Sequence, residues 1–193
     1  MATVVATPNA ANANSFLTLA EAQAYWATRL FTDMWDNSND QSAAVILATR
    51  TMVSAFAPRR EFVPPSSSHD GYFIIHPTWT GTPATTTQRL PWGRDGMLDI
   101  NGNAIAANVI PQELKDATAE LAGQMSKSDR LIDNDVAVQG LTGVRAGSVA
   151  LSFKENITML KTLPDSVMMM LVPSWLTPMV IEGLYTAQLD VIS

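Results

Sequence analysis

The stretch IPQELKDATAELAGQMSK, residues 110–127, decides the fold of this chain more than any other part of the sequence. Pro111 stands where a helix accepts proline best, at the first helical position, and Glu113 places a carboxylate in the first turn. Apolar residues then recur at helical spacing, as Leu114, Ala117, Leu121, Ala122 and Met125. This pattern predicts an amphipathic helix that ends near Lys127 and buries one face in a core.

Two more helices are predicted upstream, which together indicate a small helical bundle. Thr18 is a suitable N-cap for a helix from Leu19 to about Phe31, and residues 33–40 form a polar link. Asn39 or Asp40 can cap a second helix that runs to about Phe56. The expected buried faces are Leu19, Ala22, Trp26 and Leu30 in the first helix and Val45, Ala48, Met52 and Phe56 in the second.

Residues 59–89 have a different composition, rich in proline, serine and threonine. A connection of this length without regular structure is uncommon inside a compact domain. Within it, residues 71–76 have the composition of a strand. We therefore expect 59–89 to be an inserted, projecting arm.

Several β excursions are predicted after this arm. Asn101-Gly102 between short apolar runs indicates a tight hairpin turn, which Trp92 and Arg94 are expected to brace against the helices. Residues 136–153 read as an extended or hairpin excursion, with a half-buried strand at 149–153. A short helix should begin at Pro164-Asp165 and reach Val172, because Pro173 interrupts it.

The last residues, 179–193, are apolar but lack a clean period, which predicts an extended C-terminal arm that becomes ordered against a partner. A length of 193 residues suits one domain, here 1–178, together with this arm. The predicted fold class is therefore mainly α (α+β). It is a small helical bundle with β-hairpin excursions, a long projecting loop and an extended C-terminal arm.

Composition narrows the classes of function. Hydrophobic residues make up 47% of the chain and charged residues only 16%. Charged residues usually make up about 25% of a soluble domain. Either serine, threonine and asparagine cover the surface, or neighbouring subunits cover much of it, because interface cores are depleted in charge. The net charge of −6 argues against tight binding of duplex DNA, which requires neutralisation of phosphates.

No targeting or redox feature is expected. The chain has no cysteine, which removes disulfides and thiol nucleophiles. Residues 1–15 lack a basic segment followed by a long apolar block, so we expect neither a signal peptide nor a membrane anchor there. Nowhere does the sequence approach the roughly 18 consecutive apolar residues of a membrane span.

The sequence offers little that indicates catalysis, a metal or a cofactor. His69 and His76 lie in the 59–89 arm without a surrounding motif, and no Gly-x-Ser-x-Gly elbow occurs. Asp99, Asn101 and Asn103 have the opening spacing of a calcium loop, but Ile110 stands where the bidentate glutamate belongs. We therefore predict no catalytic residue, no metal site, no cofactor and no enzymatic activity.

Two binding interpretations of apolar residues remain open. Tyr72, Phe73 and Trp79 lie on the arm near arginines and could stack on the bases of single-stranded DNA, although Phe73 packing on its own domain is the commoner arrangement. The methionines 168–170 could form an adaptable binding surface or simply fill the core.

The order of these motifs resembles the head–tail connector (adaptor) proteins of tailed bacteriophages, many of which are labelled DnaT-like single-stranded-DNA-binding proteins. The resemblance covers roughly residues 15–56 and 89–175. It departs at 59–88, longer than expected for the family, and at Gly93, where relatives often have proline. The motifs are Ser15-Phe16-Leu17-Thr18-Leu19-Ala20-Glu21-Ala22 with Tyr25, Trp35 before residues 43–50, Leu90-Pro91-Trp92-Gly93-Arg94, Gly96, Asn101-Gly102, residues 110–117 and 120–122, 149–153 and Leu163-Pro164-Asp165.

The resemblance implies a structural virion protein without catalysis, found in the neck and, during assembly, in the host cytoplasm. Copies would form a ring, expected to be dodecameric, beneath the portal protein. The ring would extend the DNA channel, let genomic DNA pass through its lumen and dock the next neck or tail protein. The predicted portal-binding residues are Met179, Val180, Ile181, Leu184, Tyr185, Leu189, Val191 and Ile192. The resemblance also implies that the 59–89 arm contacts a neighbouring copy or a tail component, through Tyr72, Phe73, Ile74, Ile75 and Trp79. The alternatives are a single-stranded-DNA-binding replication accessory protein and a small hydrolase of unrecognised type.

Overall fold

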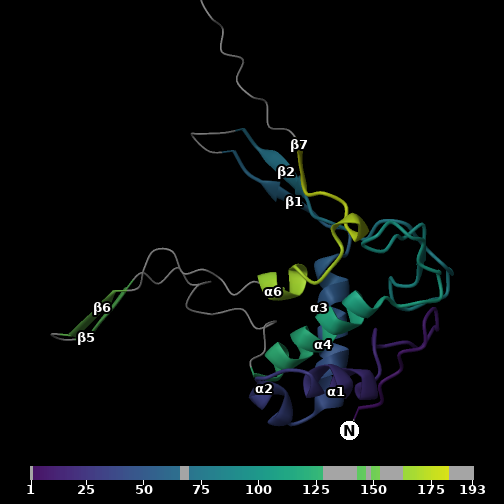
Figure 1. Ribbon diagram of the computed structural model, residues 1–193. Helices are drawn as coiled ribbons and strands as arrows, with labels where there is room; N and C mark the ends of the chain where they lie inside the picture. Colours follow the sequence, from purple (N-terminus) through teal and green to yellow (C-terminus); the bar gives the residue numbers. More distant parts are fainter. Residues whose placement is uncertain (1, 66–69, 128–142, 147–148, 153–162, 183–193) are drawn as a thin grey trace, which may run out of the picture.

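The computed structural model describes residues 2–65, 70–127, 143–146, 149–152 and 163–182 (Figure 1). It shows a mixed α/β chain with small antiparallel sheets. The helices are α1 (Leu19–Ala27), α2 (Asp33–Asp36), α3 (Gln41–Ala55), α4 (Gln112–Lys127), α6 (Asp165–Met168) and the 3-10 turn η1 (Pro173–Trp175). The strands are β1 (Arg60–Val63), β2 (Tyr72–Ile75), β3 (Thr82–Pro83), β4 (Arg94–Asp95), β5 (Gly143–Ala146), β6 (Val149–Ser152) and β7 (Val180–Glu182).

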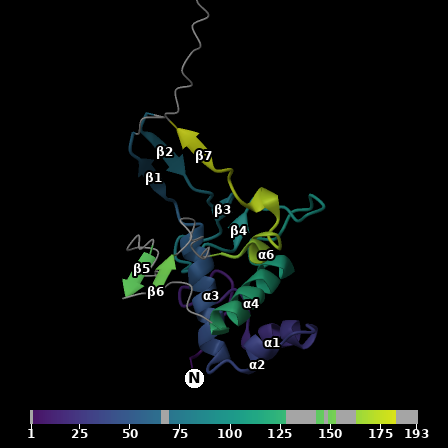
Figure 2. The same ribbon diagram turned by 90° about the vertical axis from the view of Figure 1, so that its left-hand side faces the viewer.

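The centre of the fold is the contact between α3 and α4, which lie against each other in both views (Figures 1 and 2). The predicted apolar stripes meet there. Val45, Ala48 and Met52 of α3 are fully buried, as are Leu114 and Leu121 of α4. Asp40 caps α3, and its carboxylate accepts a hydrogen bond from the Ala43 N–H at 3.0 Å. The predictions of both helices and their buried faces are confirmed.

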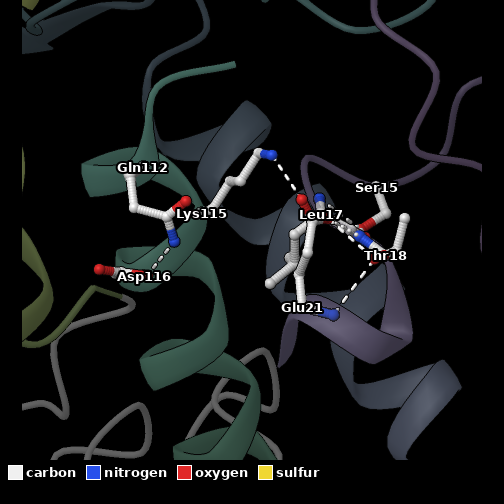
Figure 3. Close-up of polar contacts among 7 residues, drawn as sticks. All are labelled: Ser15, Leu17, Thr18, Glu21, Gln112, Lys115 and Asp116. Carbon is white, nitrogen blue, oxygen red and sulfur yellow. Dashed lines mark hydrogen bonds and ion pairs between the residues drawn. The ribbon is translucent and has the colours of Figure 1, made fainter. Parts of the chain in front are cut away.

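Helix α1 begins where its capping residues predict. Thr18 Oγ1 accepts from the Glu21 N–H at 3.2 Å, and the Glu21 carboxylate accepts from the Thr18 N–H at 2.7 Å, which completes a capping box. The other Glu21 oxygen lies 2.5 Å from Lys115 Nζ on α4 (Figure 3). The cap therefore also joins α1 to α4.

The predicted end of α1 is wrong. The helix stops at Ala27 because Thr28 is the C-cap, and its hydroxyl donates to the Tyr25 carbonyl at 2.7 Å. Leu30, expected on the buried face, is 93% exposed, and Phe31 is 81% exposed. The apolar residues continue past the helix in sequence, but the backbone no longer carries them to the core.

Residues 33–40 were predicted as a polar link and contain the one-turn helix α2 instead. Its Trp35 is buried and stacks on Trp26 of α1, with ring centroids 5.9 Å apart and planes 9° from parallel. Trp26 also donates its indole N–H to the Ala119 carbonyl of α4 at 3.1 Å. One turn of helix thus adds a second tryptophan to the core.

A buried carboxylate lies between α1 and α4. Glu120 is 6% exposed, and it accepts from the Tyr25 hydroxyl at 2.9 Å and pairs with Arg29 at 3.2 Å. Burial, and then the hydrogen bond to Glu120, raise the pKa of Tyr25 far above its ordinary range. The charge of Glu120 is therefore compensated within the helical layer.

The predicted hairpin turn at Asn101-Gly102 is confirmed. Gly102 has a φ of +83°, which favours glycine, and Leu98 bridges to Ala104 across the turn. The Asp99 carboxylate accepts from the backbone N–H groups of Asn101 and Asn103, each at 2.8 Å. A hydrogen bond from the Asn103 side chain, followed by that from its backbone, lowers the pKa of Asp99. The spacing of Asp99, Asn101 and Asn103 is thus explained by a turn that hydrogen bonds among these residues stabilise.

Towards the C-terminus, the structure shortens one prediction and confirms another. Helix α6 ends at Met168 rather than Val172, and η1 begins at Pro173 and buries Trp175. Strands β5 and β6 pair antiparallel, as the predicted hairpin excursion requires, whereas residues 136–142 and 153–162 lie outside the described residues. Within the described part of the chain, no helix is long and apolar enough to cross a membrane.

Candidate interaction surface

Three short strands from distant parts of the chain form one sheet, which stands beyond the C-terminal end of α3 in both views (Figures 1 and 2). The strand order is β1-β2-β7, and both pairs are antiparallel. Phe73 of β2 lies opposite Phe62 of β1 on one side and Glu182 of β7 on the other. We call this element the projecting sheet.

Among the described residues, neither face of the projecting sheet is packed against the helical core. None of the residues in its three strands is buried, although most of them are apolar. Directly paired residues share a face. One face therefore carries Arg60, Phe62, Phe73, Ile75, Val180 and Glu182, and the other carries Glu61, Val63, Tyr72, Ile74 and Ile181. Phe62 is 55% exposed and Ile181 45%, in contrast to the fully buried side chains between α3 and α4.

An ion pair crosses the first face. Arg60 on β1 lies 2.9 Å from Glu182 on β7, and its guanidinium carbon lies 3.8 Å from the centre of the Phe73 ring. Phe62 packs beside Phe73, with centroids 5.0 Å apart. Both charged side chains are about half exposed, so solvent screens the pair and it adds little to stability. Its geometry still places opposite charges on the two outer strands.

The second face carries a smaller polar group near its base. His76 Nε2 lies 3.1 Å from Glu61, and His76 Nδ1 lies 3.1 Å from the Arg59 guanidinium. Both ring nitrogens of His76 are therefore engaged, one by Glu61 and one by Arg59, in a polar network at the base of the sheet.

The base of the projecting sheet is fixed to the core. Thr177 donates its N–H to the Thr78 carbonyl at 2.8 Å, and Thr80 donates to the Trp175 carbonyl at 2.8 Å. Trp79 sits between these bonds and packs against Phe56 and Trp92, with centroids 4.7 and 5.2 Å apart. Trp79 is 7% exposed, so the prediction that it belongs to the contacting arm is wrong: it is part of the core.

Trp92 and Arg94 lie beside the segment that joins the projecting sheet to the core. Trp92 is 1% exposed and contacts Trp175, with centroids 4.9 Å apart. Arg94 is buried without a carboxylate partner among the described residues, and burial lowers its pKa. It donates instead to four backbone carbonyls, those of Trp79, Thr80, Gly81 and Pro91. Arg94 therefore connects the segment before β3 to the one before β4.

A hollow of about 670 Å³ lies beside this base. Val53, Phe56, Leu90 and Pro91 contribute to its apolar wall, and its two charged lining residues are Arg89 and Arg94. The rings of Phe56 and Trp79 also line it, but both side chains are buried. Stacking of bases requires accessible ring faces, so the hollow is poorly suited to a base and better suited to an apolar side chain.

The structure places side by side two segments that were predicted from the sequence as separate contact regions. Tyr72–Ile75 and Val180–Ile181 are adjacent strands of the projecting sheet, and Met179, which leads into β7, is 59% exposed. Leu184, Tyr185, Leu189, Val191 and Ile192 lie outside the described residues. Sequence reasoning missed Arg60, Phe62 and Glu182. Arg60-Glu61-Phe62-Val63 has no polar–apolar alternation that would mark a strand, and Glu182 pairs with Phe73, which lies far away in the sequence.

Among the described residues, no group of three or more histidine, aspartate or glutamate side chains could hold a metal ion. The chain matches no curated protein and no solved structure. Its residues 71–189, more than half of the 193, match the family described as putative DnaT-like ssDNA binding protein. This match includes β2, α4 and β7, whereas α1, α2, α3 and β1 lie before it. The chain belongs to this DnaT-like family.

Proposed function

We propose that this chain is a structural virion protein, a head–tail adaptor of a tailed bacteriophage. Copies of it would form a ring beneath the portal protein, extend the DNA channel and dock the next neck or tail protein. Its place would be the virion neck, after assembly in the host cytoplasm. The proposal includes no catalytic role and no cofactor.

The observation that carries this proposal is the uncovered projecting sheet. Apolar side chains occupy both of its faces, and none of its strand residues is buried. Exposed apolar patches of this kind mark surfaces that bind other proteins. The low charged fraction of 16% favours the same interpretation, because subunit interfaces are depleted in charge. The resemblance of the order of motifs to that of phage adaptors is the reason for proposing the neck of a virion as the assembly.

The C-terminal arm and strand β2 would each bind a different partner. Residues 179–193 would form the portal-binding arm, and β7 would be its first, anchored part. Tyr72 to Ile75 would contact a neighbouring copy or a tail component. Genomic DNA would only pass through the lumen, and the net charge of −6 suits a channel that does not retain DNA.

The test is co-sedimentation of the purified chain with portal rings of the same phage. Three forms should be compared: the full chain, a chain ending at residue 182 and a chain ending at residue 178. Stoichiometric binding of the full chain is expected. Loss of binding in both truncations places the contact beyond β7, and loss in the shorter one alone shows that binding requires β7. Failure of the full chain to bind a properly formed portal ring would contradict the proposal.

A second candidate is binding of single-stranded DNA, as the family's description suggests. Phe62 and Phe73 with Arg60 on one face of the projecting sheet are the arrangement that favours it, because aromatic rings and cations together bind bases and backbone. Glu182 counts against it, since it neutralises Arg60 on that face. A salt-dependent shift of a labelled oligonucleotide that is lost in Phe62→Ala and Phe73→Ala would favour this candidate over the adaptor.

A further inference from the structure

We propose that the outer strands of the projecting sheet, β1 and β7, pair with each other between neighbouring copies, so that each copy continues the sheet of the next. This inference rests on the proposed function, because it describes how copies of the chain would meet in a ring. The proposed binding partner of both open edges is a second copy of the same chain.

Both edges direct backbone groups outward that have no backbone partner among the described residues. The His76 N–H bonds to the Arg59 carbonyl at 3.1 Å, and bonded pairs alternate along an antiparallel ladder. Arg60 and Phe62 therefore turn their backbone groups away from β2, towards the open edge of β1. By the same alternation, β2 bonds to Val180 and Glu182, so the backbone groups of Ile181 face the open edge of β7.

The β7 edge has only some of the features that keep edge strands from pairing. Native proteins protect such edges by short strand length, charged side chains, proline, bulges or covering segments, and of these β7 has its three-residue length and Glu182. Val180-Ile181-Glu182 contains neither lysine nor proline, and Val180 and Ile181 are 42% and 45% exposed. An apolar, open edge of this kind is a site for adding another strand.

Charge makes β1 the fitting partner for β7. Arg60 and Glu182 lie on the same face of the sheet but on opposite edges. Within one copy they meet only because the Arg60 side chain reaches across β2, over the Phe73 ring. If the sheet continues into a second copy, Glu182 of one chain and Arg60 of the next stand on adjacent strands, about 5 Å apart where the register sets them opposite each other. Within one copy two strand spacings, about 10 Å, and an offset of two residues separate them. The edges are thus complementary to each other, and neither is complementary to itself.

The topology also suits a closed assembly. β1 and β7 both run antiparallel to β2, so they run in the same direction as each other. Contact between two different edges of identical subunits is heterologous, and it closes into a ring when the rotation between copies permits. A two-fold dimer would instead need β1 to meet β1 or β7 to meet β7, and neither pairing brings an Arg60 beside a Glu182.

Disulfide trapping tests this geometry cleanly, because the chain has no cysteine of its own. In the double variant R60C/E182C, the two cysteines of one copy are separated by β2, about 10 Å, too far for a disulfide within the chain. Mild oxidation should therefore give a ladder of dimers, trimers and larger species. Each single variant should stay monomeric, and a mixture of the two singles should give dimers only. Absence of the ladder, or equal dimer formation by either single variant alone, would overturn the proposal.

Charge reversal provides an independent measurement in sedimentation velocity, with and without portal rings. R60E alone and E182R alone should each assemble at least tenfold more weakly than the wild type, since each places like charges at the joint. An equimolar mixture of the two should recover assembly, because its edges are again complementary. If mixing restores nothing, the pair acts only within one chain and the proposal fails.

These outcomes are separable from the proposed function. If the chain binds portal rings but forms no ladder either free or on the ring, the adaptor stands and the edge pairing is wrong. A ladder without any portal binding would leave the edge pairing intact and remove the adaptor.

Discussion

Gly123 of α4 lies directly against the indole of Trp26 on α1. A Cβ at position 123 would come within 2.1 Å of Trp26 Cζ2 and 2.7 Å of Cη2. The indole has little freedom to retreat, since it stacks on Trp35 and donates a hydrogen bond to the Ala119 carbonyl. The absence of a side chain at residue 123 is what allows α1 to approach α4 this closely.

Gly123→Ala should therefore destabilise the protein, although alanine is the better helix former. The intrinsic helix preference favours alanine by roughly 1 kcal/mol. Overpacking a rigid core costs about 1–3 kcal/mol or more, so the net change should be a loss of stability. Urea unfolding followed by circular dichroism measures it.

The control for this prediction is a double-mutant cycle with Trp26→Phe, which removes the ring atoms that the new methyl group would meet. Gly123→Ala should cost much less in that background than in the wild type. Equal costs in the two backgrounds would show that the contact with Trp26 is not the reason.

Arg94→Met should lower the free energy of unfolding by about 2–4 kcal/mol, because it leaves several buried carbonyls without a donor. Arg94 is 8% exposed and donates to the carbonyls of Trp79, Thr80, Gly81 and Pro91. The matched control is Arg89→Met on the same hollow. Arg89 is exposed, so its replacement should stay within about 0.5 kcal/mol. Similar losses for both arginines would contradict this role of Arg94.

The Glu21 capping box predicts a stability change with pH. Burial raises the pKa of Glu21, but hydrogen bonds from Lys115 and from the Thr18 N–H and hydroxyl outweigh it and hold the pKa below 4.5. A carboxylate with a depressed folded pKa stabilises the fold above its unfolded pKa, and the contribution is lost as pH falls through the folded pKa. The difference in stability between wild type and Glu21→Gln should thus be largest at neutral pH and shrink below about pH 4.5.

Glu113→Gln is a suitable reference for that titration, since the Glu113 side chain makes no hydrogen bond with the described residues and also lies in a first helical turn. The difference in stability between wild type and Glu113→Gln should be smaller and should change less with pH. Thr18→Ala removes the other half of the capping box and should cost about 1 kcal/mol at neutral pH. A pH-independent effect of Glu21→Gln would refute the assigned cap.

The projecting sheet predicts a separation between assembly and stability. Phe62 is 55% exposed, so Phe62→Ser should change the free energy of unfolding by less than about 1 kcal/mol while reducing binding to portal rings and to other copies. Phe56→Ser is the contrasting variant. Phe56 is 4% exposed, and its replacement should cost about 3–5 kcal/mol. If Phe62→Ser unfolds the chain, the sheet belongs to the fold and is no free surface.

The helices could be predicted from the sequence because their signals are local. Pro111 with Glu113, Asp40 and Thr18 mark helix starts, and the 3.6-residue period marks the buried faces of α3 and α4. Local signals gave wrong predictions at two places where a single side chain determines the local structure. The Thr28 hydroxyl ends α1 before Leu30, and a single turn at α2 buries Trp35.

The projecting sheet could be predicted only in part, because its pairing is long-range. The composition of β2 indicated a strand, and the apolar residues of β7 indicated a contact segment. Nothing in the sequence alone joins Phe73 to Glu182, which are over a hundred residues apart. Trp79 follows β2 closely in the sequence and was therefore predicted to belong to the same arm. Hydrogen bonds between its neighbours Thr78 and Thr80 and the 175–177 segment hold it in the core instead.

The central claim is that this chain forms a ring on the portal through the projecting sheet. Electron microscopy of portal rings incubated with the full chain tests it most directly, with Phe62→Ser as the matched variant. The account predicts a continuous ring of added density beneath the portal, which the variant fails to form although it remains folded. Portal rings that carry no added density with the wild-type chain, or an equally complete ring with the variant, would contradict it.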